Sequence, residues 1–511
     1  MCPYLAIYLI LLAKLTAGAK IMFTTMPQGR SHIFSMMPLA HKLVDQGHEV
    51  TVFFEVFREE LPFGGGVKSQ MIQWKNMPKE VVEMFDESQP EWVHVLWNKD
   101  YPPPELLDPW IASTTSLTHI FKHQPDDFFK ISNQTWDLMF VDPLFAPAGA
   151  TMALLNQPKT LYIHYFTAMI DPLYTYYKGL SRSLAAAPST VPVARHDTPF
   201  WEASNFSDRL RVFRDSIWFM WLYWNEVQTL VSKAVSPVLP QFSFHKWCSG
   251  DSLSVYDYFD TLDFPLPTNN QYVSSSASCK STKSLPADLE AFVNDTKSAG
   301  TILMAFGTIV RWDIADPRAR NAMIEVVSQL KEYRIFWAMP HWMVGEKPKL
   351  PAHVKVVEWL PQTDILAHPK TKLFMSHGGL KSVKESICAE MPVLYMPMFA
   401  EQQRNAFLIK SLGFAEYINK KRLVPNEIVQ TIRKMTSTPS YYQNAKKVKR
   451  LWLDRPIPAV EAAAFKVNQV IKYKGLPSKY FALKFKESWL EFLFVDTMSL
   501  PILALFVIVK L

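Results

Sequence analysis

Residues 20–54 read KIMFTTMPQGRSHIFSMMPLAHKLVDQGHEVTVFF. The apolar run 20–26 predicts a strand, and the turn-forming residues 27–31 predict a loop. Residues 32–46 place apolar side chains at helical spacing, and Gly47 suits the position that follows a helix end. Residues 49–54 predict the next strand. Because strand–loop–helix–strand units build parallel sheets, this stretch predicts an α/β fold.

The same alternation continues along the 511 residues, a length that favours two domains. Further strands are predicted at 137–142, 161–164, 301–306, 334–338, 354–358, 372–375 and 393–396, with helices at 402–411, 425–435 and 458–472. The small polar residues between 274 and 286 suit a linker. We therefore expect two doubly wound halves, 20–273 and 287–455, that face each other across a cleft at the carboxyl ends of their strands.

Both ends of the chain are apolar. Residues 1–19 have an apolar core and the small residues Ala17-Gly-Ala19, which predicts a secretory signal peptide; a buried first strand is the alternative. Residues 492–509 form a membrane-seeking tail, of which 497–509 are uncharged. A spanning helix needs roughly 20 such residues, so this anchor is short, and a buried helix is the alternative.

The composition excludes some classes of protein. With 49% hydrophobic and 20% charged residues the chain is globular and not disordered. The net charge of +7 comes with short basic runs only, so we expect no nucleic-acid partner. Beyond residue 19 the sparse cysteines Cys248, Cys279 and Cys388 do not form a dense disulfide framework, and the fold must rely on its core. The candidate N-glycosylation sites are Asn133, Asn205 and Asn294.

Two strand ends carry side chains suited to proton transfer. His32 lies where a loop meets a helix, and the positive end of the helix disfavours imidazolium, so the ring should stay neutral and able to accept a proton. Asp142 ends a strand in the same half and could orient that ring. Each residue has an ordinary structural alternative, a surface histidine and a turn aspartate. Together they predict a His–Asp pair.

Two loops in the second half suit anions. Residues His377-Gly-Gly379 end a strand and open a helix, where backbone N–H groups can approach a phosphate. Gly307-Thr308 follows another strand in the same way, although either loop could be a simple tight turn. The sequence has no Walker loop, no zincin motif and no Asp-x-Asp, so we expect no metal and no cofactor.

Residues 359–386 read WLPQTDILAHPKTKLFMSHGGLKSVKES, and 396–405 read MPMFAEQQRN. This block closely resembles the nucleotide-sugar signature of animal UDP-glucuronosyltransferases and their UDP-glycosyltransferase relatives. The resemblance implies the B-type glycosyltransferase fold, with C-terminal helices at 456–486 returning toward the first half. It also implies inverting transfer of a sugar, glucuronate or glucose, from a UDP-sugar to a hydroxyl of a small lipophilic acceptor, without a metal.

The resemblance also assigns roles to residues. His32 would be the general base and Asp142 its partner. Trp359 would stack on uracil, Gln362 would pair with its edge and Glu385 would hold the ribose. Glu401 and Gln402 would face the sugar. The donor site as a whole would comprise Gly307, Thr308, Trp359, Gln362, His377, Gly378, Gly379, Lys381, Ser382, Glu385, Glu401 and Gln402.

Two of these positions depart from the family pattern, since Lys381 replaces the usual Asn and Glu401 the usual Asp. They keep two alternatives open, a catalytically silent homologue that acts as a binding or regulatory partner, and a lipid glycosyltransferase of the same fold. By resemblance the protein would reside in the endoplasmic reticulum lumen, associated with the membrane through its tail, with a homo-oligomer possible.

Overall fold

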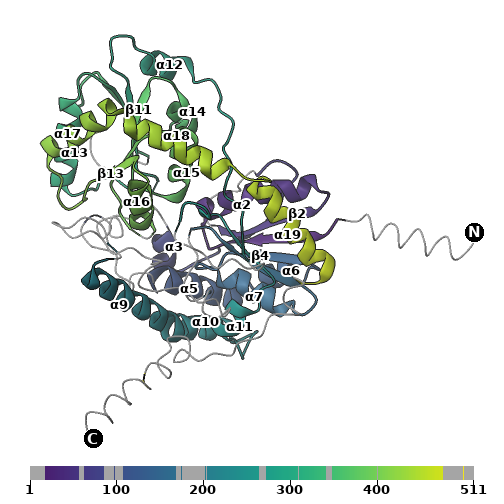
Figure 1. Cartoon of the computed structure of the whole chain (residues 1–511). Coiled ribbons are helices and arrows are strands. Elements are labelled where there is room, and N and C mark those ends of the chain that lie inside the picture. The colour runs from purple at the N-terminus through teal and green to yellow at the C-terminus, as the bar shows by residue number, and fades with distance from the viewer. Residues whose placement is uncertain are drawn as a thin grey trace, which may run out of the picture.

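The structure is a computed structural model, shown in Figure 1. It describes residues 18–56, 63–85, 107–168, 204–263, 272–308, 310–340, 348–399 and 401–475, together with residues 97, 174, 202 and 499. Nearly all of the expected signal peptide 1–19 and of the expected tail 492–509 lies outside these residues, as do residues 476–486 of the expected C-terminal helices.

The N-terminal half is built on a parallel sheet with strand order β3-β2-β1-β4-β5-β6-β7. Its strands are β1 (Lys20–Thr24), β2 (Glu49–Val56), β3 (Lys68–Gln73), β4 (Leu138–Val141), β5 (Leu161–Phe166), β6 (Ser254–Tyr256) and β7 (Tyr272–Ser274). Both faces are covered, since two separate apolar cores contain alternate residues of the same strands. This explains why the central strands β1, β4 and β5 are largely apolar, whereas the edge strand β3 is mostly polar.

The C-terminal half repeats this arrangement in a parallel sheet of order β10-β9-β8-β11-β12-β13. Its strands are β8 (Thr301–Ala305), β9 (Arg334–Ala338), β10 (Val354–Val357), β11 (Thr371–Ser376), β12 (Val393–Tyr395) and β13 (Ala415–Tyr417). The prediction of two doubly wound α/β halves is therefore confirmed.

The helices cover both sheets (Figure 1). In the first half they are α2 (Arg30–Asp45), α3 (Lys79–Phe85), α5 (Leu107–His123), α6 (Pro125–Ser132), α7 (Pro147–Leu155), α9 (Phe206–Leu222), the π-helical turn η2 (Tyr223–Val227), α10 (Gln228–Val235) and α11 (Phe244–Ser249). In the second half they are α12 (Ala287–Val293), α13 (Pro317–Gln329), α14 (Gln362–Ala367), α15 (Leu380–Cys388), α16 (Gln402–Ser411), α17 (Pro425–Ser437) and α18 (Pro439–Leu453), and α19 (Ala459–Tyr473) follows.

Helix α19 comes last in the described chain but packs on the first half, beside α2 and β7 (Figure 1). Its buried alanine and valine side chains belong to the same apolar core as β1 and α2. Polar contacts reinforce this packing: His48 Nε2 lies 2.8 Å from Asn468 Oδ1, and Lys42 forms an ion pair with Glu461. The chain thus crosses from one half to the other twice.

The connection between the halves differs in two details from the expectation. Strand β7 includes Ser274, so the segment without regular structure runs from 275 to 286. Cys279 in that segment forms a disulfide with Cys388 at the end of α15. This single disulfide is not a dense framework, but no cysteine pair was predicted from the sequence. Three cysteines far apart in sequence carry no pairing signal, because pairing depends on their distance in the fold.

Within the part of the chain that the structure describes, no helix is both long enough and apolar enough to cross a bilayer. The aromatic stretch 217–224 instead forms the end of α9 and the start of the π-helical turn. Trp218 and Trp221 are exposed there, whereas Trp224 packs against the core.

Candidate active site

The predicted site residues follow four strands at equivalent points of the two sheets. In the first half, His32 lies in the helix after β1, and Asp142 directly follows β4. In the second half, Gly307 follows β8, and His377 follows β11. Strands β1 and β4 are neighbours, as are β8 and β11, and at each of these pairs the strand order reverses. Ligands of open α/β sheets bind at such switch points.

His32 and Asp142 form a close pair. The Nδ1 atom of His32 lies 2.5 Å from Oδ2 of Asp142. The Asp142 side chain is fully buried, while that of His32 is 20% exposed. The carboxylate is held independently of the ring, because its Oδ1 atom accepts a hydrogen bond from the backbone N–H of Leu144 at 3.0 Å. A fixed, buried carboxylate can therefore orient the histidine.

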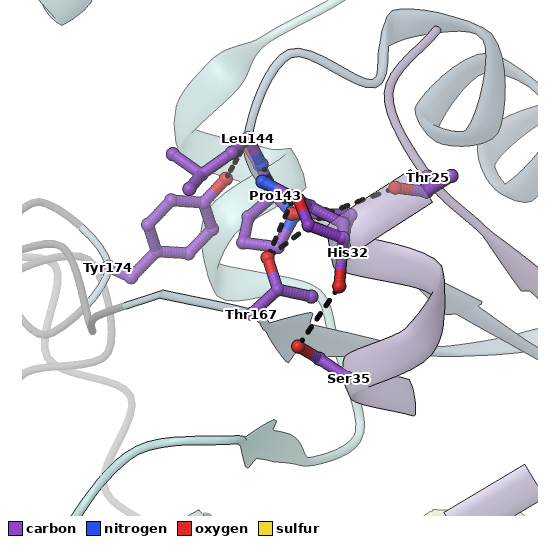
Figure 2. A network of polar contacts seen from close by, with 9 residues as sticks. Thr25, His32, Ser35, Pro143, Leu144, Thr167 and Tyr174 are labelled. Atoms are coloured by element: carbon purple, nitrogen blue, oxygen red, sulfur yellow. Dashed lines mark hydrogen bonds and ion pairs between the residues drawn. The ribbon is translucent and has the colours of Figure 1, made fainter. Parts of the chain in front are cut away.

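Two threonines that could not be singled out from the sequence complete this pair. Thr167, just after β5, places its hydroxyl 2.7 Å from His32 Nδ1 and 3.2 Å from Asp142 Oδ2. The Thr25 hydroxyl lies 3.4 Å from the same carboxylate oxygen. Figure 2 shows Thr25, His32 and Thr167 pointing toward one another from three different elements. In the sequence, the one feature that the two threonines share is that each directly follows a strand of the same sheet.

The arrangement determines which ring nitrogen is available for chemistry. An ionised carboxylate only accepts hydrogen bonds, so Nδ1 of His32 carries the proton that points to Asp142. The Thr167 hydroxyl can then donate to Asp142 and accept from Nδ1. In the neutral ring, Nε2 is left with a lone pair on the partly exposed side of the residue. This is the arrangement that a general base requires.

In the second half, the imidazole of His377 is enclosed by two glycines. A Cβ atom on Gly379 would lie 2.5 Å from His377 Nε2, and one on Gly307 would lie 2.9 Å from it. Burial lowers the pKa of His377 to about 4, so its ring is neutral at physiological pH. A neutral imidazole still has one N–H to donate, and Nδ1 is buried without a hydrogen-bond partner among the described atoms.

Lys381 is the nearest positive charge to this turn in sequence. It lies in the first turn of α15, and its Nζ atom lies 5.5 Å from the centroid of the Phe34 ring in α2. Burial lowers the pKa of Lys381 to about 8, and nearby Lys280 and Lys384 act in the same direction. Since Phe34 is two residues from His32, Lys381 extends from the glycine turn to the helix that carries His32.

Glu401 and Gln402 lie where the halves approach each other, but they differ in role. Burial raises the pKa of Glu401, against the opposing effects of backbone hydrogen bonds and of nearby His32. Glu401 is thus within electrostatic range of His32 in the other half. The carbonyl oxygen of the Gln402 side chain accepts from the backbone N–H groups of Met398 at 2.9 Å and Phe399 at 3.2 Å. Only its amide nitrogen remains for a ligand.

The residues expected to bind the nucleoside lie together at α14 and α15. Gln362 donates to Glu385 Oε2 at 2.5 Å and to the Ser382 hydroxyl at 3.2 Å. Thr363 donates to the other Glu385 oxygen at 3.0 Å. Trp359 is 75% exposed, so a face of its indole is open for stacking. Thr308 is half-buried beside Gly307.

A small cavity lies behind the His32–Asp142 pair. Its free volume is about 10 Å³, which is room for about one water molecule. Its wall is largely apolar and includes Asp142, Pro143, Trp110, Val231, Phe244 and Trp247. The Asp142 carboxylate is therefore surrounded mainly by aromatic and aliphatic side chains, and the cavity itself is too small to hold a ring.

Two further predictions concern metal ions and N-glycosylation sites. Among the described residues, no group of three His, Cys, Asp or Glu side chains is arranged to hold a metal ion. Asn133, Asn205 and Asn294 are all exposed, at helix ends.

Solved glycosyltransferase structures share this fold. The glycosyltransferase VinC, solved with DTDP, has a TM-score of 0.56 and 14% identity, and the match covers 89% of this chain and 100% of that one. The calicheamicin glycosyltransferase CalG4 has a TM-score of 0.55 and 15% identity, with 89% and 98% covered. At these identities the likeness establishes the two-domain B-type fold.

Sequence comparison identifies the family. UDP-glucuronosyltransferase 2B23 of Macaca fascicularis is 24% identical over 476 residues, covering 87% of this chain and 83% of that protein. UDP-glucuronosyltransferase 2A3 of Pongo abelii is 25% identical over 473 residues, covering 88% and 84%. Residues 20–510 match the family described as UDP-glucoronosyl and UDP-glucosyl transferase. The chain therefore belongs to this family and is a UDP-glycosyltransferase.

Proposed function

We propose that this protein transfers a sugar, glucuronate or glucose, from a UDP-sugar to a hydroxyl of a small lipophilic acceptor, with inversion at the anomeric carbon. The observation that carries the proposal is the His32–Asp142 pair at 2.5 Å, with Lys381 Nζ of the other half 5.5 Å from the centroid of the Phe34 ring in the same helix as His32. A base and a donor-binding turn on opposite sides of one cleft are what a direct displacement needs.

In the proposed reaction, His32 Nε2 takes the proton of the acceptor hydroxyl as its oxygen attacks the anomeric carbon. A new carbon–oxygen bond forms on the face opposite the diphosphate. The bond to the β-phosphate oxygen breaks, and UDP leaves with that electron pair. Asp142 stabilises the imidazolium that forms, because its buried carboxylate is already bonded to Nδ1.

The departing UDP gains negative charge, and we assign its stabilisation to the start of α15. The first N–H groups of a helix favour an anion. The Lys381 ammonium would add a positive charge, and the His377 ring would add an N–H donor. Trp359, Gln362 and Glu385 would hold uracil and ribose. With these donors in place, we expect the departing UDP to be stabilised without a metal ion.

The acceptor class rests on the family and on the apolar surroundings of Asp142. The side chains beside this carboxylate are mainly aromatic and aliphatic, among them Trp110, Phe244 and Trp247. Such surroundings favour the apolar part of an acceptor whose hydroxyl points to His32.

We place the protein in the endoplasmic reticulum lumen, associated with the membrane through residues 492–509. The apolar segment 1–19 with its small cleavage residues supports this location. The Cys279–Cys388 disulfide is also typical of an oxidising compartment. The exposed Asn133, Asn205 and Asn294 would be accessible to glycosylation there.

A donor panel tests the proposal. The full chain, in microsomes, is incubated with UDP-glucuronate, UDP-glucose, UDP-xylose or UDP-N-acetylglucosamine and a set of phenols, and UDP affinity is measured in parallel. We expect β-glycoside product with one of the first two donors. UDP binding without transfer from any donor would favour the silent homologue. Transfer to membrane lipids but not to phenols would favour the lipid glycosyltransferase.

A further inference from the structure

A short segment of the first half is buried in the second half. Residues 257–259, which follow β6, are all buried. Asp257 pairs with Lys384 of α15, and the Phe259 ring packs edge-on against Trp452 of α18. Between them, Tyr258 extends toward α16 in the centre of this contact.

Tyr258 is connected to the glycine turn by two consecutive hydrogen bonds. Its hydroxyl donates to Asn405 Oδ1 at 2.7 Å. The Nδ2 atom of Asn405 donates to the carbonyl oxygen of Gly378 at 2.8 Å. Tyr258 is 2% exposed and Asn405 is fully buried, so water does not compete for either bond. A residue of one half thereby reaches the backbone of the turn in the other half.

The chemistry of the amide fixes the direction of this relay. The Gly378 carbonyl can only accept, so the NH₂ end of Asn405 must face it. The amide oxygen then faces Tyr258 and requires a donor. Without the Tyr258 hydroxyl, that oxygen would be buried and unsatisfied. The correct orientation of Asn405, and with it the bond to Gly378, therefore depends on Tyr258.

The ring of Tyr258 is itself held in place. The guanidinium carbon of Arg404 lies 4.9 Å from the ring centroid, and Arg404 also forms an ion pair with Asp263. Arg404 and Asn405 are adjacent in α16, and both are buried. The contact thus depends on the relative position of the two halves, because Tyr258 and Asp263 belong to one half and α16 to the other.

We propose that Tyr258 is a positioning residue, supplied by the first half, that holds the Gly378 turn through Asn405 in the conformation that receives the diphosphate of the donor. This role rests on the proposed function, since it presupposes that the turn binds UDP. It makes donor affinity a property of both halves, although every expected donor contact comes from the second.

The test is Tyr258→Phe in the full-length protein, which removes one hydroxyl and keeps the ring. UDP affinity is measured by calorimetry, and hydrogen exchange is measured for peptides that cover 376–380. We expect UDP to bind about tenfold more weakly, the effect of leaving one buried acceptor unsatisfied. We also expect faster exchange at 376–380. KM for the donor should rise more than kcat falls.

Tyr333→Phe is the matched control. The Tyr333 hydroxyl lies 2.8 Å from the Thr436 hydroxyl, in the same half but away from the turn. Tyr333→Phe should lower the melting temperature about as much as Tyr258→Phe does, without changing UDP affinity. Equal UDP affinity in Tyr258→Phe and the unaltered protein, or an equal loss in both variants, would overturn the positioning role.

A second variant keeps the test decisive. Asn405→Ala removes both bonds, so adding Tyr258→Phe to it should weaken UDP binding no further. Independent, additive losses would overturn the relay. If the unaltered protein does not bind UDP, the proposed function fails, and the positioning role with it. If it binds UDP and Tyr258→Phe binds equally well, only the positioning role fails.

Discussion

The two halves of the molecule have the same strand order at their centres but place different chemistry there. In the first half, the strands around the switch point lead to ionisable and hydroxyl side chains, namely His32, Asp142 and Thr167. In the second half, the equivalent strands lead to glycine turns enclosing a neutral histidine. One topology thus places ionisable and hydroxyl side chains at the switch point of one half and glycine turns with accessible backbone N–H groups at that of the other.

The difference follows from what each step requires. Proton transfer needs a group that can change its charge, together with a partner fixed by bonds from several elements. Asp142 is bonded by residues that follow three different strands and is fully buried. Anion binding needs N–H groups that can be closely approached, so side chains must be absent. We therefore expect substitutions around His32 and Asp142 to affect kcat, and those that change the glycine turns, directly or through Tyr258, to affect UDP affinity.

The largest effect should come from His32→Ala. The variant lacks the only group proposed to take the acceptor proton, so we expect kcat to fall by about 10³-fold, within the range for general bases. UDP affinity, measured by calorimetry, should stay within about twofold, because His32 belongs to the other half. Undiminished turnover would remove His32 from the mechanism. A parallel loss of UDP affinity would break the division of roles between the halves.

Gly379→Ala should show the opposite pattern. The new Cβ would lie 2.5 Å from His377 Nε2, and the ring cannot withdraw because Gly307 confines it on another side. The backbone of Gly379, at φ −60 and ψ 142, suits alanine, so the clash is the only strain. Overpacking costs about 1–3 kcal/mol, which corresponds to about 5- to 150-fold weaker UDP binding.

Gly64→Ala is the control for this substitution. A Cβ there meets no atom within 4 Å, although φ is +64. That variant should lose some stability but no UDP affinity. If Gly379→Ala binds UDP normally, the turn does not approach the diphosphate.

The pKa of Lys381 predicts that UDP affinity depends on pH through a residue of the second half. Its pKa is about 8 without ligand, and a bound diphosphate must raise that pKa because it favours the ammonium. UDP affinity is therefore highest below pH 8 and falls as pH rises from 8 toward the pKa of the complex. A rise of one unit corresponds to about tenfold in affinity. Calorimetry between pH 7 and 10 measures this slope.

The neighbouring titratable groups do not account for this slope, so replacing Lys381 alone is the control. Burial also lowers the pKa of Lys384, but its ammonium pairs with Asp257. His377, with a pKa of about 4, does not titrate in this range. Lys381→Met should therefore bind UDP more weakly at pH 7 and show no slope above pH 8. A slope that persists in Lys381→Met would assign it to another group.

The sequence predicted the second half better than the first, for a physical reason. Strands β8, β9, β10, β11 and β12 and helix α16 lie within two residues of their predicted bounds, because each is a short apolar run between clear turn signals. The glycine turns could be found because local sequence alone makes them. Helix α18 was not predicted, although its apolar residues have helical spacing.

The first half depends more on contacts between distant segments. Strands β6 and β7 are three residues long and were missed, as was the equally short β13 of the second half. Strand β12 is no longer, but it could be predicted because its apolar run is continued by Met396. The Cys279–Cys388 disulfide and the Tyr258–Asn405 bond join residues more than 100 positions apart. Thr167 was missed for the same reason. A threonine after a strand is ordinary, and only the fold brings it to His32.

Thr167→Val tests this missed residue and should give the smallest effect. The isosteric change removes the hydroxyl that contacts His32 Nδ1 and Asp142 Oδ2 but keeps the pair itself. The loss of one such hydrogen bond, about 0.5–1.5 kcal/mol, corresponds to roughly a 2- to 12-fold fall in kcat. UDP affinity should not change. Steady-state kinetics on the best phenol measure the effect.

Thr160→Val provides the comparison in the same half. The Thr160 hydroxyl is buried and donates to the Trp136 carbonyl at 2.7 Å, away from the His32–Asp142 pair. It should lower stability by a similar amount and leave kcat unchanged. If both variants lower kcat equally, the first half responds to loss of stability in general, and Thr167 has no part in orienting the base. If only Thr167→Val does so, Thr167 positions the proton acceptor His32 together with Asp142, whereas the turns of the opposite half rely on glycine and backbone.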